Sequence, residues 1–122
     1  MPTILIIDDD QIVREAIKDI LEIINVDVID ASDGIEGLEV FQANQAKING
    51  IIIDRRMPKM GGLETMKKLR QIDPRIPIVM SSGYAESNVA ASPDLIAPDA
   101  YLYKPYEIQD LIDLVENIIL KG

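Results

Sequence analysis

The stretch Thr3-Ile4-Leu5-Ile6-Ile7-Asp8-Asp9-Asp10 opens the chain and decides how it folds. Its first five residues form a short, continuous, isoleucine-rich run, which is typical of a strand covered on both faces of a sheet. Three carboxylates follow at once, where such a strand would leave the core and enter a loop. In an open parallel sheet, ligands collect in the loops beyond the carboxyl ends of the strands. The stretch therefore predicts a buried strand with an acidic site at its end.

Two further pieces of the chain end in a similar way. Ile51-Ile52-Ile53 is a second apolar run and stops at Asp54, and the run from Tyr101 to Tyr103 stops at Lys104-Pro105. Several carboxylates and one ammonium that meet at one rim of a sheet make a site for a small hard cation and an anion. Together the pieces indicate phosphoryl chemistry, which depends on such charge compensation.

The composition indicates one globular domain over residues 1–122 and excludes several functions. At 48% hydrophobic and 27% charged residues, the chain can bury a core and is not of the disordered class. It has no cysteine and no histidine, which excludes disulfides, zinc sites of the usual kind and histidine general bases. Its formal net charge of −9 argues against nonspecific binding to nucleic acid or anionic lipid. No apolar run approaches the roughly 18–20 residues that span a bilayer.

Apolar and amphipathic blocks alternate along the chain. The expected strands cover residues 3–7, 26–31, 51–53, 76–80 and 101–103. The residues expected on the inner faces of the intervening helices are Val13, Ile17, Leu21 and Ile24; Ile35, Leu38 and Phe41; Leu63, Met66 and Leu69; and Ile108, Leu111, Ile112, Val115 and Ile119. Strand and helix alternating five times imply an α/β sandwich around a parallel sheet.

The segment between Ser82 and Tyr101 is the weakest element. A helix there should be short and should end before Pro93, because proline cannot continue a helix. Small residues stand at 90–92, where larger apolar residues would anchor a helix. We therefore expect residues 85–97 to be the least firmly docked regular element.

Four motifs, in order and spacing, carry a resemblance to a known family. They are Ile4-Leu5-Ile6-Ile7-Asp8-Asp9-Asp10, Asp54-Arg55-Arg56-Met57-Pro58-Lys59-Met60-Gly61-Gly62, Pro77-Ile78-Val79-Met80-Ser81-Ser82-Gly83 and Tyr101-Leu102-Tyr103-Lys104-Pro105. With them the chain resembles the receiver domain of two-component response regulators over essentially its whole length. The resemblance implies a flavodoxin-like fold, a (βα)5 three-layer sandwich whose parallel five-stranded sheet has the order 2-1-3-4-5. It also implies a cytoplasmic signalling module rather than an enzyme, with only self-phosphorylation and self-dephosphorylation of its own.

The resemblance assigns a role to each residue at the rim. Asp54 would be the phosphoacceptor, a carboxylate nucleophile that forms an acyl phosphate. The cofactor would be Mg²⁺, with Mn²⁺ as a substitute, because Mg²⁺ prefers oxygen ligands and takes only one or two carboxylates. Asp9, Asp54 and the backbone carbonyl of Arg56 would be ligands, and Asp8 would hold a metal-bound water. Lys104 would pair with Asp54 and then with the phosphoryl oxygens.

Without a cation, the three carboxylates of Asp8, Asp9 and Asp54 would repel one another. At 4 Å and an effective dielectric of about 20, each pair would repel by about 4 kcal/mol. We expect this repulsion to favour cation entry and to raise at least one carboxyl pKa.

The resemblance also implies a switch that reads out phosphorylation. Ser82 would swing in to hydrogen-bond the phosphoryl group, and Tyr101 would then move inward. That movement would change the face made by the fourth helix, the fifth strand and the fifth helix. Arg56 and Tyr84 would flank the phosphoryl group, and the Lys104–Pro105 peptide bond would be cis.

The implied partners are proteins. A histidine kinase or a histidine phosphotransfer protein would donate the phosphoryl group, and a downstream protein or domain would receive the signal. Neither nucleic acid nor membrane is an expected partner of this domain, which should be a monomer or a weak dimer. A receiver of this kind occurs alone, within a hybrid kinase or within a longer regulator.

Two departures from the family pattern and several alternatives stand beside this interpretation. Gly61 and Asn49 stand where the family commonly has Asp, and Gly83 stands where a small residue is expected. Taken singly, the acidic triplet could be a helix cap and the segment after Asp54 a turn. A degenerate receiver, used only as a flavodoxin-like interaction module, is disfavoured by the complete acidic and basic set. A haloacid-dehalogenase-type phosphatase would need a second Asp where Arg56 stands.

Overall fold

The computed structural model describes residues 1–83 and 97–120, and five parallel strands within them form one sheet. The strands are β1 (Thr3–Ile7), β2 (Asp27–Ala31), β3 (Ile48–Asp54), β4 (Ile78–Gly83) and β5 (Ala100–Lys104). Their order is β2-β1-β3-β4-β5, and every neighbouring pair is parallel. The predicted α/β fold, with its strand order of 2-1-3-4-5, is confirmed.

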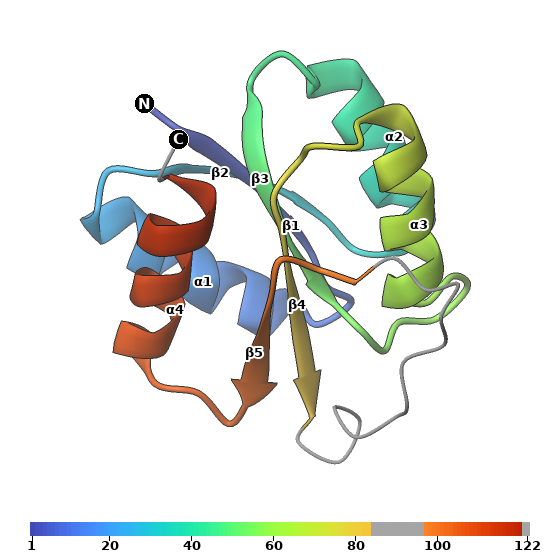
Figure 1. The fold of residues 1–122 in the computed structure, drawn as a ribbon. Helices are drawn as coiled ribbons and strands as arrows, with labels where there is room; N and C mark the ends of the chain where they lie inside the picture. The colour runs from blue at the N-terminus through green and yellow to red at the C-terminus, as the bar shows by residue number, and fades with distance from the viewer. Residues whose placement is uncertain (84–96, 121–122) are drawn as a thin grey trace.

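Helices cover both faces of the sheet. They are α1 (Gln11–Ile23), α2 (Gly34–Asn44), α3 (Gly62–Ile72) and α4 (Ile108–Leu114), and α4 runs on into a π-helical turn, η2 (Val115–Ile119). Figure 1 shows α1 and α4 on one face and α2 and α3 on the other. The helix expected between Ser82 and Tyr101, with its predicted end and its soft docking, falls on residues 84–96, which lie outside the described residues.

An aspartate side chain caps the start of each of the helices α1 and α2. The side chain of Asp10 accepts a hydrogen bond from the backbone N–H of Ile12, so α1 starts directly after the acidic triplet. Asp33 does the same for Glu36 at the start of α2. These caps satisfy N–H groups that have no partner within the helix. They fix both helix starts at the carboxyl edge of the sheet.

The core lies in two layers, one on each face of the sheet. Every residue of β1 is buried, and its side chains alternate between the layers, as expected for a strand covered on both sides. One layer is built on α2 and α3 and contains Leu5, Ile7, Phe41, Ile51, Ile53, Met66, Leu69, Ile78 and Met80. The other is built on α1 and α4 and contains Ile4, Ile6, Ile17, Leu21, Ile52, Val79, Leu102, Leu111 and Val115. Among the described residues, none of the helices is long and apolar enough to cross a bilayer.

Two residues predicted to face the core do not. Ile35 is 48% exposed, because the buried residues of α2 are Gly34, Gly37 and Phe41, so that only Phe41 of the predicted stripe is buried and Leu38 is half-buried. A Cβ at Gly37 would lie 2.5 Å from Cδ1 of Ile7, so only glycine permits this close approach. Ile108 is 59% exposed, since it is the first residue of α4 and burial begins one turn later, at Leu111.

Candidate functional site

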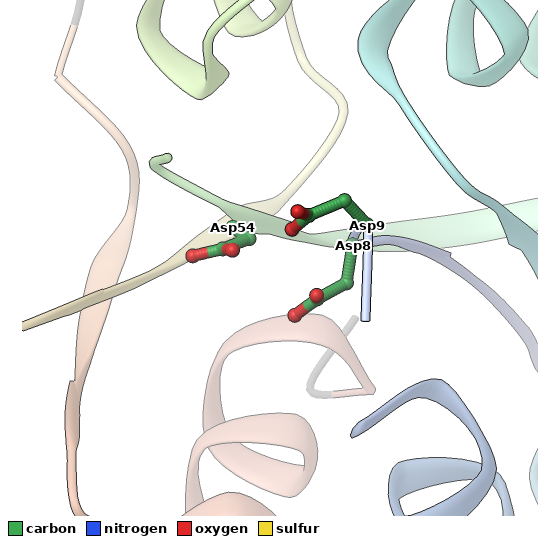
Figure 2. Close-up of side chains that lie close together, drawn as sticks. All are labelled: Asp8, Asp9 and Asp54. Atoms are coloured by element: carbon green, nitrogen blue, oxygen red, sulfur yellow. The ribbon is translucent and has the colours of Figure 1, made fainter. Parts of the chain in front are cut away.

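The acidic residues predicted from the sequence meet at the carboxyl edge of the sheet. Asp8 and Asp9 follow β1, Asp54 is the last residue of β3, and these two strands are neighbours. Carboxylate oxygens of Asp8, Asp9 and Asp54 all lie within 4.8 Å of one another. Figure 2 shows the three side chains close together where the two strands end. Asp8 and Asp54 are buried, whereas Asp9 is exposed, so the group forms a partly sunken acidic site.

The ammonium group of Lys104 reaches these carboxylates from β5, the strand at the edge of the sheet. Lys104 is the last residue of β5, and its Nζ lies 3.2 Å from Oδ1 of Asp54. Because β4 lies between β3 and β5, the lysine side chain must pass over β4 to make this contact. The Lys104–Pro105 peptide bond is cis, as the resemblance implies.

The site shifts the pKa of its ionisable groups. The pKa of Asp8 is raised to about 6, chiefly by burial and also by the charges of Asp54 and Asp9, against the lowering effects of a hydrogen bond from the Asp10 backbone N–H and of the Lys104 charge. Burial likewise raises the pKa of Asp54, although Lys104 works to lower it. Burial lowers the pKa of Lys104, but the carboxylates of Asp54 and Asp8 outweigh it and the net shift is upward.

The prediction that at least one carboxyl pKa rises is thus confirmed, but its stated cause was incomplete. The expectation named repulsion among the carboxylates as the cause, whereas burial is the largest contribution to the raised pKa of both Asp8 and Asp54. The ends of two fully buried strands hold these carboxyl groups partly out of water, where their charged forms are less stable.

The donor set suits a small hard cation. Three carboxylates within 4.8 Å of one another offer the oxygen ligands that Mg²⁺ prefers, and the chain has no histidine or cysteine that would favour a softer metal. Because burial leaves the negative charges of these carboxylates poorly solvated, a bound cation would compensate them and stabilise the site. The backbone N–H of Arg56 donates a hydrogen bond to the Asp54 carboxylate. The role of the Arg56 carbonyl as a ligand stays a prediction.

The loop after Asp54 is closed by a tight backbone contact. The N–H of Gly62 donates to the carbonyl of Arg55 over 2.8 Å, and a Cβ at Gly62 would lie only 2.4 Å from the carbonyl oxygen of Asp54. At Gly61, by contrast, the nearest atom to an added Cβ would be 3.6 Å away. The departure at Gly61 is therefore at a position where a Cβ would make only an ordinary van der Waals contact, whereas the glycine beside it is a geometric requirement of the site.

The residues predicted to form the switch lie on two neighbouring strands, Ser82 on β4 and Tyr101 on β5. Ser82 is fully buried, and its Oγ lies 3.2 Å from the carbonyl oxygen of Gly83. In register it pairs with Tyr103 rather than with Tyr101. The rings of Tyr101 and Tyr103 are stacked, with centroids 5.6 Å apart, and Tyr101 packs against the core. Tyr103 therefore neighbours both predicted switch residues: it is the register partner of Ser82, and its ring stacks on that of Tyr101. Tyr84 lies outside the described residues.

Sequence reasoning missed two residues of this site. Arg14 lies off the apolar stripe predicted for its helix, yet its side chain is only 14% exposed, and its Nη1 donates to the backbone carbonyl of Asp8. Tyr106 is half-buried, and burial raises its pKa while the charges of Asp8 and Asp54 act on it in the same direction. A signal for Arg14 was present, because helical side chains point back towards the helix start and α1 begins at the acidic triplet.

Comparison with known proteins identifies this arrangement. The sequence model described as response regulator receiver domain matches residues 4–116. The chain belongs to this receiver family. Its fold resembles that of a response regulator receiver domain protein from Clostridium thermocellum, with a TM-score of 0.87, 31% identity and coverage of 99% of this chain and 96% of that one. It also resembles the response regulator TrrA from Thermotoga maritima, whose structure was solved in complex with Mg(2+)-BeF, with a TM-score of 0.84, 27% identity and coverage of 95% and 97%.

The receiver matches only part of its curated relatives. It is 28% identical to the response regulator protein TmoT of Ectopseudomonas mendocina, over 95% of this chain and 52% of TmoT. It is 37% identical to a protein-glutamate methylesterase/protein-glutamine glutaminase of Trichodesmium erythraeum, over 94% of this chain and 33% of that protein. The chain therefore spans about half of the length of these relatives, or less.

Proposed function

We propose that this receiver accepts a phosphoryl group on Asp54, in a magnesium-dependent reaction, from a phosphohistidine on a histidine kinase or a histidine phosphotransfer protein. The observation that carries the proposal is the position of Asp54. It is buried at the end of β3, with Asp8 and Asp9 within 4.8 Å on the neighbouring strand and Lys104 Nζ 3.2 Å away. The Mg(2+)-BeF complex of TrrA supports the same use of the site.

The reaction is a simple displacement at phosphorus. An oxygen of the Asp54 carboxylate attacks the phosphorus atom, and the new O–P bond forms as the N–P bond of the donor breaks. The electron pair of the broken bond returns to the imidazole nitrogen, which leaves an acyl phosphate on Asp54 and an unphosphorylated donor. No bond rearrangement is required of any other residue, so the rest of the site acts by position and charge.

Each neighbouring residue has a part in this positioning. The Lys104 ammonium, already 3.2 Å from Asp54, offers N–H donors to the oxygens of the incoming phosphoryl group. The Arg56 backbone N–H holds the Asp54 carboxylate in place. Asp9 and Asp54 would be ligands of the cation, with Asp8 holding a water on it. When bound, magnesium supplies positive charge that offsets the charge of the phosphoryl oxygens.

Readout in this proposal runs through β4 and β5. The Ser82 hydroxyl would turn from the Gly83 carbonyl towards the phosphoryl group, and Tyr101 would move inward, with the stacked Tyr103 carried along. The face that changes would be made by the helix expected before β5, by β5 itself and by α4. We propose a downstream protein or domain as its partner, and a monomer or weak dimer as the resting state.

The remaining expectations belong to the same proposal. Residues 1–122 would be one receiver domain that works in the cytoplasm, with Mn²⁺ able to replace Mg²⁺. It would have no catalytic turnover beyond phosphorylation and dephosphorylation of itself. The complete set of Asp8, Asp9, Asp54, Ser82 and Lys104 at one edge supports this function over that of a degenerate interaction module.

Intact-mass analysis tests the proposal. Incubation with acetyl phosphate and magnesium should add one phosphoryl group, and chelation of magnesium beforehand should prevent it. Asp54→Asn should abolish the addition, whereas Asp113→Asn, at an exposed position on α4, should leave it unchanged. An Asp54→Asn variant that gains a stable phosphoryl group at the wild-type rate would overturn the assignment.

A further inference from the structure

Arg14 connects the acidic site to the edge strand of the sheet. It lies one turn into α1, and its Nε is 3.0 Å from Oδ2 of Asp30 on β2. Its Nη1 lies 2.7 Å from the backbone carbonyl oxygen of Asp8. The Arg14 side chain is only 14% exposed, and its hydrogen bond to the Asp8 carbonyl is partly buried, where a charge-assisted hydrogen bond is strong, whereas its contact with Asp30 is open to solvent.

With these contacts, the backbone N–H, the side-chain Oδ1 and the backbone carbonyl of Asp8 each have a hydrogen-bond partner. Its N–H donates to the carbonyl of Ala31 over 3.1 Å, and its Oδ1 accepts the N–H of Asp10 over 2.9 Å. Its carbonyl accepts the Arg14 guanidinium. That carbonyl belongs to the peptide plane that leads into Asp9, so the bond from Arg14 fixes the plane. The Asp9 side chain is exposed, and its direction towards Asp54 therefore depends on this backbone.

The geometry of the guanidinium explains why an arginine stands here. Two N–H groups in a rigid fork reach two acceptors at once, the Asp30 carboxylate and the Asp8 carbonyl. A lysine ammonium is a compact charge on a flexible stem, and it would not hold both acceptors in fixed directions. Asp30 compensates the positive charge that Arg14 brings close to a site for cations.

We propose that Arg14 is a positioning residue for the divalent cation, and that it acts by fixing the Asp8–Asp9 peptide so that the Asp9 carboxylate faces Asp54. The inference rests on the proposed magnesium site. It makes a prediction opposite in sign to simple electrostatics. If Arg14 acted on the cation only through its charge, its removal would tighten magnesium binding, because like charges repel. If Arg14 acts by position, its removal weakens binding.

Calorimetric titration with magnesium alone separates the two cases. Arg14→Met should weaken magnesium binding by roughly tenfold, the usual effect of losing a residue that orients a metal ligand. Arg14→Lys should also weaken it, although the charge is kept, and Asp30→Asn should weaken it less. Magnesium affinity in Arg14→Met equal to or tighter than in the wild type would overturn the proposal. Wild-type protein that binds no magnesium would instead overturn the function on which the proposal rests.

Arg70 provides a matched control. It is also 14% exposed, and its Nη2 forms a 2.8 Å ion pair with the half-exposed Asp99, close to the first residue of β4 at the opposite edge of the sheet. Arg70→Met should therefore lose comparable stability in urea without any change in magnesium affinity. If Arg70→Met weakens magnesium binding as much as Arg14→Met does, the effect is general loosening of the fold, and the proposed role of Arg14 is wrong. Far-UV circular dichroism of each variant establishes that it is folded before titration.

Discussion

Replacing Asp8 by asparagine should stabilise this protein in the absence of magnesium. Burial raises the pKa of Asp8 from 3.8 to about 6, so near pH 7 the folded state must hold a charge that its surroundings disfavour. A difference of about two pKa units corresponds to about 3 kcal/mol of free energy of unfolding. Asparagine keeps an oxygen that accepts the N–H of Asp10, and the Arg14 contact involves only the backbone of Asp8. We therefore expect Asp8→Asn to raise the free energy of unfolding by about 2 kcal/mol, with about 3 as the ceiling.

The pH dependence gives this prediction its sign. The folded state binds a proton at Asp8 more tightly than the unfolded chain does, so stability contributed by this group falls as pH rises through the window from about 4 to about 6. Asp8→Asn has no ionisable group at this position, so it does not lose this stability as pH rises. Its advantage over the wild type should be largest near pH 7, should shrink as pH falls through this window, and should disappear below about pH 3, where Asp8 is protonated in both the folded and the unfolded state.

Urea unfolding followed by far-UV circular dichroism measures the effect, since the chain has no tryptophan to report by fluorescence. Asp10→Asn is the matched control, because Asp10 is exposed and asparagine caps a helix as well as aspartate does. Added magnesium should stabilise the wild type more than Asp8→Asn and so reduce the gap between them. Equal stability of Asp8→Asn and wild type near pH 7, or a gap that does not depend on pH, would refute the reasoning.

Three further changes test other parts of the account. Lys104→Ala should leave magnesium affinity equal or make it tighter, because an ammonium repels the cation. The same variant should weaken the change in amide exchange that beryllofluoride causes, because the ammonium attracts phosphoryl oxygens. Clearly weaker magnesium binding of Lys104→Ala in calorimetry would contradict this. Gly62→Ala should destabilise the fold strongly in urea, because its Cβ would meet backbone at 2.4 Å, whereas Gly61→Ala should be neutral or stabilising by up to about 1 kcal/mol; similar effects of the two would refute the close-approach argument. Ser81→Ala should stabilise by about 1 kcal/mol, because Ser81 Oγ is buried without a hydrogen-bond partner among the described residues; a loss of stability would show that the hydroxyl has a partner.

The strands and the acidic edge could be predicted because they depend on local pattern. A continuous apolar run such as Ile51-Ile52-Ile53 has few alternatives to a buried strand, and the residue after it must stand at the carboxyl edge. Parallel strands bring those edges together, so Asp8, Asp9 and Asp54 converge wherever their strands are neighbours. The strand order itself came from the family resemblance.

The features that the sequence did not predict correctly depend on distances between residues far apart in the chain, which a local pattern does not contain. Ile35 fits a helical stripe, but the approach of Gly37 to Ile7 turns α2 so that Ile35 faces solvent. The place of Arg14 in the first turn of its helix indicates that it can reach the acidic triplet, but its two partners, Asp30 and the Asp8 carbonyl, follow only from the packing of α1 beside β1 and β2. The size of the Asp8 pKa shift likewise depends on burial, which is a property of the packed sheet and not of the triplet.

The central claim, that Asp54 is the residue that receives the phosphoryl group, can be tested by locating the modified residue directly. Borohydride reduces an acyl phosphate of aspartate to homoserine, so treatment of the phosphorylated protein marks the acceptor permanently. After acetyl phosphate, magnesium and borohydride, peptide sequencing by tandem mass spectrometry should find homoserine at residue 54 and aspartate at residues 8 and 9. Homoserine at Asp8 or Asp9, with residue 54 still aspartate, would contradict the account.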